Sequence, residues 1–389
     1  MLFRHSLCTV EFIASRQSYD WLCDALEVYK PRQSEYGRLA IEGALTSKRK
    51  ILSLVNEGYV LGWDDPRLYT VIALRRRGVP PGAIISFVST LGVSTAASII
   101  ETARFDHAVR QYLENTVPRL LMVMHPLKVT ISNLPEDYVL MIEKPLHPKA
   151  PELGSTTVPF TRTVYIDRDD FRLEDSKDFY RLAPGKTVGL FQAPHPITCT
   201  SYKTDPESGE VVELICTLEE GVAKKPKAFV QWVAEYEPLG SPVRIEETRI
   251  FHRLFKSDHL PSDYKSDINP DSLEVVKGAM VEVGFWPVAK QSILDARRES
   301  KARAEKAAAE RSRSAGQDAE GGEESMELRV GMECVRFQGL RVAYFAVDKD
   351  SKLACLDEAA ADVNPGRREG DVLVLNRIVS LKEDSGKST

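Results

Sequence analysis

The residues best suited to chemistry in this sequence form one short cluster, TSKRK, at positions 46–50. Apolar side chains follow at helical spacing in residues 51–55, so we expect the cluster in a loop or in the first turn of a helix. Backbone N–H groups at a helix start, together with two or three cationic side chains, suit a polyphosphate. Short basic clusters are also common on solvated surfaces, so the pattern alone leaves both interpretations open.

The chain around this cluster begins as an α/β segment. Residues 7–13 predict a short apolar strand, residues 19–28 predict a helix, and residues 34–41 lead back into a sheet. A complete nucleotide-binding domain needs several βαβ units of roughly 30 residues each. Residues 1–50 are too few for this, so we expect them to be one piece of a larger fold.

The periodicity changes twice in the rest of the chain. Apolar residues at three- and four-residue spacing predict helices at 68–76, 82–91 and 104–113. From residue 127 the period becomes two, which predicts strands separated by turns and favours barrels or sandwiches. The predicted strands cover residues 128–133, 163–166, 188–191, 213–217, 228–233, 341–347 and 371–379.

A charged stretch interrupts the strands at residues 295–327. Its first half is rich in alanine and charge, with Glu299 and Arg303 spaced for an i,i+4 pair, and predicts a solvated single helix. Its second half is rich in glycine and glutamate and predicts disorder. A basic helix can touch RNA phosphates, but a spacer is the simpler interpretation.

Composition and net charge limit which binding sites, compartments and membrane segments we expect. The formal net charge is −5, so a nucleic-acid surface has to come from a local basic stripe. The six cysteines form no CxxC pair and no Cys/His metal spacing, so we expect no metal site and a reducing compartment. No stretch approaches the ~18 apolar residues of a membrane span, and the N-terminus lacks the apolar core of a signal peptide. We therefore expect a soluble, cytoplasmic protein.

Several motifs together resemble one family. TSKRK is similar to the second signature of class I aminoacyl-tRNA synthetases, in the form used by glutaminyl and glutamyl enzymes. GWDDPR at 62–67 and ALRRRG at 73–78 resemble the continuation of that signature, and HSLCT at 5–9 resembles a strand of the amino-acid pocket. The resemblance to eukaryotic-type glutaminyl-tRNA synthetases extends over nearly the whole chain and breaks only in the charged stretch.

The resemblance implies roles at the ATP end. Lys48 matches the signature lysine that contacts the triphosphate, and Ser47 matches the hydroxyl beside it, so these two are the expected catalytic residues. Arg38 and Leu39, in EYGRL, match a pair next to the adenosine. ATP is thereby expected as a substrate, with Mg²⁺ bound to it.

The resemblance also implies a glutamine pocket. Glutamyl enzymes place an arginine at the position of Cys8, because a glutamate side chain must be neutralised. A glutamine pocket needs a neutral group there, since a buried arginine without a carboxylate is strongly penalised. Cys8 fits the glutamine form, and Gln33 matches a residue of the same pocket. A buried cysteine is otherwise a small apolar filler.

Contacts to tRNA are expected in the second half of the chain. On the resemblance, the anticodon-binding residues are Arg119, Lys224, Lys225, Lys227, Gln338 and Arg341. Unstacked anticodon bases expose their Watson–Crick edges to such side chains, while lysines take the phosphates. One position departs from the family, whose His-Trp pair is Gln231-Trp232 here, so a contact there is in question.

The expected fold is a multi-domain α+β protein. Residues 1–50 would be an α/β fragment of a Rossmann-type class I catalytic domain, and residues 51–126 a helical connecting domain. Two anticodon-binding β-barrels would occupy 127–294 and 328–389, separated by the charged low-complexity insert at 295–327.

The expected activity is that of a glutamine–tRNA ligase, which joins glutamine to tRNA(Gln) through glutaminyl-adenylate at the expense of ATP. The seven histidines include no HxGH pair of the first class I signature, so we expect this chain alone to be incomplete for catalysis. Two alternatives stay open. A glutamyl-tRNA synthetase would share most motifs but carry arginine in place of Cys8, and a non-catalytic tRNA-binding remnant would have no need of TSKRK.

Overall fold

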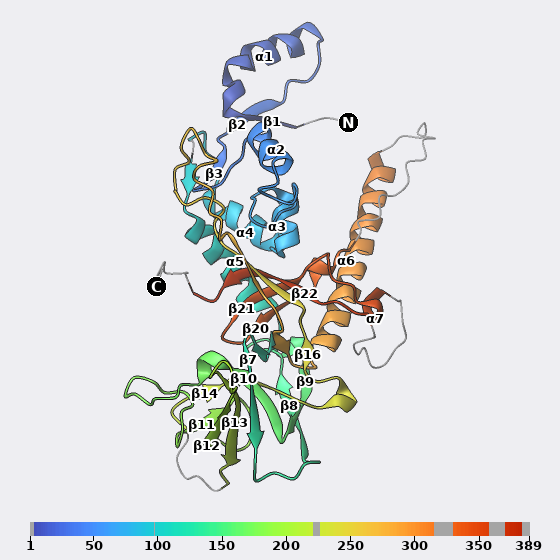
Figure 1. The fold of residues 1–389 in the computed structure, drawn as a ribbon. Helices are drawn as coiled ribbons and strands as arrows, with labels where there is room; N and C mark the ends of the chain where they lie inside the picture. The colour runs from blue at the N-terminus through green and yellow to red at the C-terminus, as the bar shows by residue number, and fades with distance from the viewer. Residues whose placement is uncertain (1–3, 97, 221–225, 315–329, 358–369, 383–389) are drawn as a thin grey trace.

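The computed structural model describes residues 4–96, 98–220, 226–314, 330–357 and 370–382. Figure 1 shows an elongated molecule. A small α/β unit lies at one end, a helical region follows it, one large sheet occupies the middle, and another lies at the far end. Within the described part of the chain, no helix combines the length and apolar character that crossing a bilayer requires.

The unit at the N-terminal end is built from two strands and a helix. Its elements are β1 (His5–Thr9), η1 (Val10–Ser15), α1 (Arg16–Ala25) and β2 (Arg32–Tyr36). The two strands pair in parallel. The strand predicted over residues 7–13 is wrong in its extent, because the chain leaves β1 at Thr9 and enters a 3-10 helix. The apolar run did not reveal this, since a short apolar run does not distinguish a strand from a helix.

The three helices predicted at 68–76, 82–91 and 104–113 are confirmed, and one short parallel strand pair lies at the edge of their region. Its elements are β3 (Leu39–Ile41), α2 (Lys48–Asn56), α3 (Val71–Arg77), α4 (Pro81–Leu91), β4 (Ser98–Ile100) and α5 (Thr102–Thr116). Local chemistry sets the helix ends. The Thr70 hydroxyl accepts from the Ala73 N–H at 3.1 Å at the start of α3. Pro81 occupies the first turn of α4.

The far end of the molecule is a seven-stranded mixed sheet. Its strands, in spatial order, are β14 (Phe229–Val230), β11 (Thr187–Leu190), β12 (Ile197–Thr204), β13 (Val211–Leu218), β7 (Pro126–Ile131), β10 (Thr163–Asp167) and β15 (Trp232–Ala234). Its two edge strands are separated in the chain by Gln231 alone, so the sheet curls until its edges come close together, forming a near-barrel. A hairpin of β8 (Val139–Pro145) and β9 (Ser155–Thr161) packs beside it.

The middle of the molecule holds a six-stranded sheet assembled from distant parts of the chain. Its order is β18 (Leu273–Val276), β17 (Glu247–Phe251), β22 (Val374–Ser380), β21 (Ala343–Val347), β20 (Arg336–Gly339) and β5 (Arg119–Leu120). A three-stranded sheet adjoins it, made of β16 (Val243–Arg244), β19 (Met280–Val281) and β6 (Met122–Val123). Strands after residue 330 therefore complete a sheet that residues 119–276 begin.

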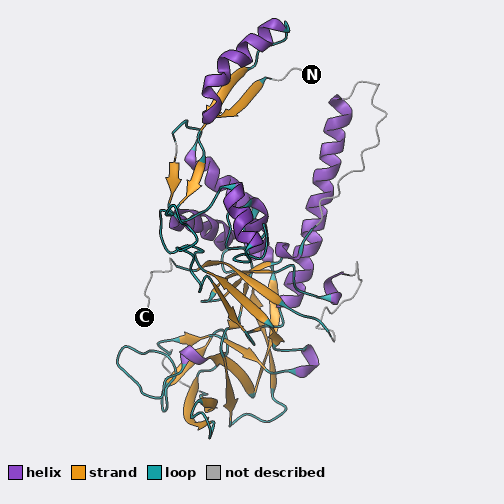
Figure 2. Cartoon of the chain, turned by 45° about the horizontal axis from the view of Figure 1, so that its top comes forward, coloured by secondary structure: helices purple, strands orange, loops and turns teal. Residues whose placement is uncertain are grey.

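The helix predicted in the charged stretch is confirmed, and it starts before that stretch. Helix α6 (Phe285–Ser314) begins with side chains packed in the core, including Phe285 and Trp286. It then runs away from the sheets, as Figures 1 and 2 both show. Arg303 Nη2 lies 3.2 Å from Glu299 Oε2, which confirms the predicted pair. The second half of the stretch, from residue 315, lies outside the described residues.

Short elements complete the fold, namely η2 (Pro151–Leu153), η3 (Arg168–Asp170), η4 (Glu237–Leu239), η5 (Met332–Cys334) and α7 (Ala354–Asp357).

The ALRRRG motif joins the helical region to the six-stranded sheet. Arg76, in α3, donates from Nε and Nη2 to the Asp348 carboxylate at 3.0 and 3.1 Å. Asn376, in β22, donates to the Arg76 carbonyl at 2.9 Å. Gly78 ends α3 with a φ of 99°, and a Cβ at this position would collide with Ala346 of β21. The motif therefore fixes the helices directly against the sheet.

Candidate functional site

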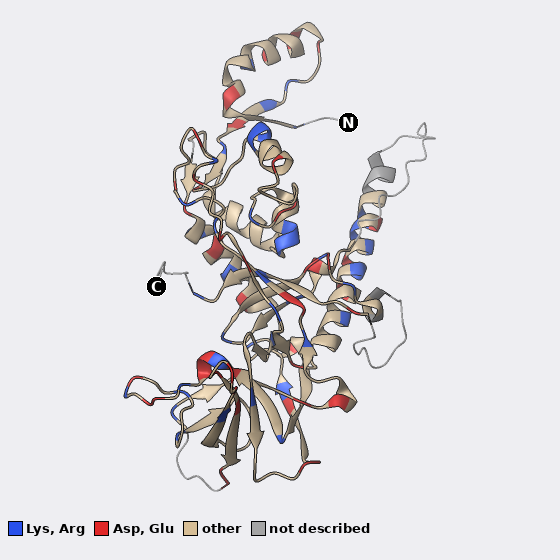
Figure 3. Ribbon diagram, viewed as in Figure 1, with Lys and Arg blue, Asp and Glu red and all other residues tan. Residues whose placement is uncertain are grey.

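The basic cluster lies at the start of α2, as predicted. Ser47 is the N-cap residue, with φ −73° and ψ 118°, and the helix begins at Lys48. Lys48 is exposed, and Figure 3 shows basic residues at this end of α2. The first N–H groups of a helix lack helical partners and carry the positive end of its dipole. The helix start therefore suits an anion such as phosphate.

Two nearby cations have protein partners. Lys50 Nζ lies 4.9 Å from the centroid of the Tyr264 ring, a cation–π contact. Arg38 Nε lies 2.5 Å from Glu11 Oε1, and the Arg38 side chain is 75% exposed. Leu39, the next residue, is 40% exposed in β3. Arg38 and Leu39 thus lie at the surface, and their placement beside an adenosine stays a prediction.

Cys8 and Gln33 lie on the same face of the N-terminal sheet. Cys8 is opposite Glu35, and Gln33 is opposite Ser6, so these four side chains point to one side. Arg16 Nε donates to Glu35 Oε1 at 2.9 Å. Hydrogen bonding from Arg16 lowers the pKa of the Glu35 carboxyl, against the opposing effect of desolvation. The pair balances the charge beside Cys8, and sequence reasoning missed it because its members share no motif.

Arg119 and Gln338, far apart in the chain, are cross-strand partners in β5 and β20. Arg119 Nε and Gln338 Oε1 are both buried, with no hydrogen-bond partner among the residues that the structure describes. Lys144 Nζ donates to the Arg119 carbonyl at 2.7 Å and lies 3.1 Å from Glu282 Oε1. Burial raises the pKa of the Glu282 carboxyl, and Lys144 opposes the shift. This buried ion pair positions the strand that carries Arg119.

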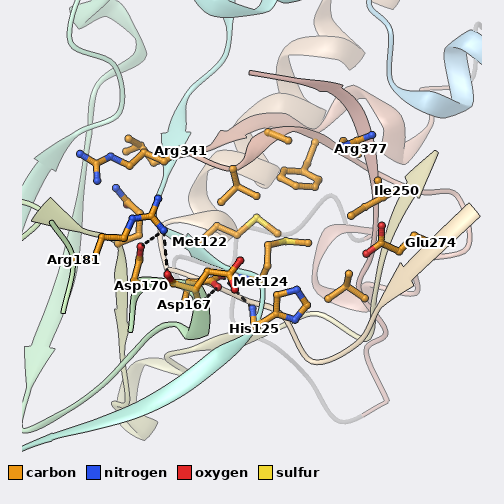
Figure 4. A pocket seen from close by; sticks show the side chains of 17 residues that line it. Met122, Met124, His125, Asp167, Asp170, Arg181, Ile250, Glu274, Arg341 and Arg377 are labelled. Carbon is orange, nitrogen blue, oxygen red and sulfur yellow. Dashed lines mark hydrogen bonds and ion pairs between the residues drawn. The ribbon is translucent and has the colours of Figure 1, made fainter. Parts of the chain in front are cut away.

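Arg341 lies in the turn after β20 and lines a cavity of about 370 Å³ between the seven-stranded and six-stranded sheets (Figure 4). Its φ of 61° is in the left-handed region, which residues other than glycine rarely adopt. Arg341 Nη1 donates to the carbonyl of Phe229, in an edge strand of the far sheet. Arg119 and Gln338 are not among the described residues that line this cavity. Those two residues are therefore neighbours of each other, and Arg341 belongs to a different part of the surface.

The predicted lysines precede the same edge strand. Lys227 is exposed two residues before β14. Lys224 and Lys225 lie outside the described residues.

Comparison with known proteins adds to this geometry. The family model for the catalytic domain of class I tRNA synthetases (E and Q) matches residues 1–115. The model for the anti-codon binding domain of the same class matches residues 117–219. The two matches meet where the helical region gives way to strands.

Curated relatives extend the similarity over almost the whole chain. The probable glutamine–tRNA ligase of Schizosaccharomyces pombe is 47% identical, over 99% of this chain and 43% of that protein. The glutamine–tRNA ligase of Saccharomyces cerevisiae is 42% identical, over 98% of this chain and 44% of that protein. The cytoplasmic glutamine–tRNA ligase of Arabidopsis thaliana is 37% identical, over 98% and 41%. The chain belongs to the class I tRNA synthetases (E and Q), whose two models together match more than half of it. It spans less than half the length of each of these three relatives.

Two charged residues of this synthetase chain escaped sequence reasoning. Arg181 and Asp170 line the same cavity as Arg341, and Arg181 Nη1 lies 2.9 Å from Asp170 Oδ1 (Figure 4). Burial raises the pKa of the Asp170 carboxyl to about 6, although Arg181 opposes the shift. Asp170 ends the short 3-10 helix η3, and Arg181 lies in the connection from η3 to β11, where neither periodicity nor a motif marks them.

A second cavity, of about 730 Å³, shares Arg181 and Arg341 with the first. Arg172 and the aromatic residues Phe179 and Tyr180 also line it. The guanidinium of Arg172 lies 4.5 Å from the centroid of the Phe179 ring, and Tyr180 is 53% exposed. Aromatic rings and arginines are the side chains on which single-stranded bases stack and against which phosphates bind. In a synthetase chain, this pair of cavities is a candidate surface for an unpaired RNA loop.

Proposed function

We propose that this chain is part of a glutamine–tRNA ligase, which attaches glutamine to tRNA(Gln) through glutaminyl-adenylate with consumption of ATP. The observation that carries the proposal is the similarity to curated glutamine–tRNA ligases over 98–99% of the chain. The start of α2 and the cavities between the sheets supply an anion site and an RNA surface at separate places. The proposed compartment is the cytoplasm, which the name of the Arabidopsis relative states for that protein.

Lys48 and Ser47 are the residues that we assign to the ATP phosphates. ATP, with Mg²⁺, supplies the activated phosphorus that the glutamine carboxylate attacks and the pyrophosphate that leaves. The reaction needs positioning and stabilisation of developing phosphate charge rather than a protein nucleophile. An exposed ammonium group at a helix start meets that need, and we propose that Arg38 and Leu39 flank the adenosine.

The glutamine side chain is proposed to lie near Cys8 and Gln33. Cys8 is neutral, and the Arg16–Glu35 pair beside it balances its own charge. A carboxamide substrate would therefore meet hydrogen-bonding groups without an unpaired buried charge, which a glutamate side chain would introduce. This supports glutamine over glutamate as the amino acid.

The proposed tRNA contacts lie on the two large sheets and the segments between their strands. We assign the anticodon to Arg119, Gln338 and Arg341, with Lys224, Lys225 and Lys227 on the phosphates. The buried unpaired atoms of Arg119 and Gln338 support this assignment, because a buried polar atom without a partner is costly until a ligand pairs with it. In this proposal the two large sheets form anticodon-binding barrels, and the helices connect them to the ATP end.

The test is an aminoacylation assay with tRNA(Gln), ATP and the protein as it occurs in its cells. Glutamine and glutamate are supplied in separate reactions. We expect charging with glutamine, and a fall in kcat of about a hundredfold or more for Lys48→Ala. The dissociation constant for tRNA should change little, because Lys48 is assigned to ATP. Lys203→Ala is the matched control, since this lysine is 63% exposed on a strand of the far sheet. Charging with glutamate instead, or equal loss in both variants, would overturn the proposal.

A further inference from the structure

Gln231 is a buried amide whose side chain has no hydrogen-bond partner in the part of the chain that the structure describes. It is the single residue between the edge strands β14 and β15, where the seven-stranded sheet comes closest to closing on itself. Only 4% of it is exposed, and both Nε2 and Oε1 lack a hydrogen-bond partner among the described residues. An unsatisfied buried amide typically costs about 1–3 kcal/mol, so its retention calls for a reason.

The residues on either side of Gln231 have different surroundings from it. Val230 and Trp232 both belong to the core of the far sheet, and the Trp232 indole N–H donates to the Phe191 carbonyl at 2.9 Å. Gln231 does not belong to that core and lines a cavity instead. Trp232 is only 1% exposed and cannot offer its ring for stacking. Of the Gln-Trp pair singled out in the sequence, the glutamine lines the cavity that Arg341 also lines, and Trp232 does not.

That cavity is the 370 Å³ space that Arg341 also lines. Arg341 is held there by the carbonyl of Phe229, two residues before Gln231. Arg181 lines another part of the wall, and apolar residues such as Met122 and Leu340 complete it. The carboxylates of Asp167, Asp169, Asp170 and Glu274 also line it, and Arg181 is paired with Asp170. The space thus combines apolar walls for a flat ring, charged groups of both signs, and one amide that presents a donor and an acceptor side by side.

We propose that Gln231 is a specificity-determining residue, whose amide pairs with the edge of one unstacked base of the tRNA anticodon loop. The inference rests on the proposed tRNA-binding function and adds a residue that this function did not include. A primary amide matches any base edge with an adjacent donor and acceptor, and it can rotate to suit either order. An RNA base fits better than a peptide, since Arg341 accompanies the amide and donates to a carbonyl, which leaves its charge for a phosphate.

The experiment measures binding of the full chain to an anticodon stem–loop of tRNA(Gln) at one fixed salt concentration, by fluorescence anisotropy. Each loop base is removed in turn as an abasic site, and every RNA is titrated against the wild type and Gln231→Met. Methionine has a similar length and no hydrogen-bonding amide. Gln111→Met is the matched control, because Gln111 is exposed on α5.

One loop position should behave differently from the others. There, removing the base should weaken wild-type binding about tenfold or more, yet weaken Gln231→Met binding little further. At all other positions, the fold-loss in affinity from removing the base and the fold-loss from Gln231→Met should multiply, as expected for sites that do not touch. Gln231→Met should also melt at the same temperature as the wild type or higher, because it removes an unpaired buried amide. A merely structural glutamine would lower the melting temperature instead.

Two negative results are distinguishable. If the wild type discriminates loop bases but every combination with Gln231→Met is multiplicative, Gln231 contacts no base and this inference is wrong. If the wild type responds to no loop base at all, the proposed anticodon-binding function itself fails. Should Gln231→Met fold poorly, the wild-type titrations can be repeated with base analogues that lack the Watson–Crick groups at the same position. Equal affinity for the analogue and the natural base there would overturn the inference.

Discussion

Replacing Arg76 by methionine is expected to weaken the junction between the helical region and the six-stranded sheet. Arg76 is 8% exposed, and its partner Asp348 is fully buried. Two of its hydrogen bonds reach Asp348, and a third reaches Asp350 at 2.8 Å. Removing one partner of a buried ion pair typically costs about 3–5 kcal/mol. Arg249 Nη1 also lies 3.3 Å from Asp348 Oδ1, so we expect a loss near the lower limit, about 3 kcal/mol.

The loss should depend on pH in a defined direction. Desolvation, the largest single effect, would raise the pKa of Asp348. The hydrogen bonds and charge of Arg76, together with hydrogen bonds from the Asp350 N–H and from Asn376, outweigh it and hold that pKa below its usual value. A lowered native pKa stabilises the fold above the unfolded pKa of about 4, and the contribution disappears as pH falls through the native pKa. Without Arg76 the Asp348 carboxyl should protonate more readily. The difference between wild type and variant should therefore shrink as the pH falls from 7 toward 4.

Urea unfolding at pH 7 and at pH 4.5 measures both effects, with Arg75→Met as the control. Arg75 is on the same helix, 54% exposed, and paired with Glu333, so its replacement should cost about 1 kcal/mol or less. The double variant with Asp348→Asn should recover part of the loss, because the unpaired charge is then absent. Equal losses for the two arginines, or a loss for Arg76→Met that does not change with pH, would refute the reasoning.

Two further predictions concern buried carboxyls. Burial raises the native pKa of Asp170 from 3.8 to about 6. Ionisation of this carboxyl therefore lowers the free energy of unfolding as the pH rises through 6. Asp170→Asn should therefore stabilise the protein at pH 8, by at most about 3 kcal/mol, and give no gain at pH 4. Thermal melts at the two pH values measure this, and an equal gain at both would contradict it. Lys144→Met should cost about 3–5 kcal/mol in urea unfolding, because Glu282 is left buried without its partner. Adding Glu282→Gln should restore much of that loss, and failure to restore any would show that the charge is not its cause.

Local patterns predicted much of the fold. The helix starting at Lys48, the helices up to residue 116 and the strands near residues 126–131 and 163–167 were all visible as periodicity in short windows. The strand at residues 7–13 was predicted too long, because its apolar residues suit both a strand and the 3-10 helix that follows. Helix α6 began earlier than the charged stretch, because its buried first turns carry a core pattern rather than a charged one.

For the candidate site too, local sequence predicted some features and missed those that depend on distant parts of the chain. By itself the sequence determined which chemical groups are present and which of them are adjacent, such as Ser47 beside Lys48 at a helix start, since capping and dipole effects act within one turn. Only the tertiary structure decided that Arg119 pairs with Gln338, that Arg181 faces Asp170, and that Gln231 lines a cavity while Trp232 is buried in a core. Such pairings depend on which strands become neighbours in a sheet and on how far that sheet curls. Those are properties of long-range packing and burial, and no short window of sequence contains them.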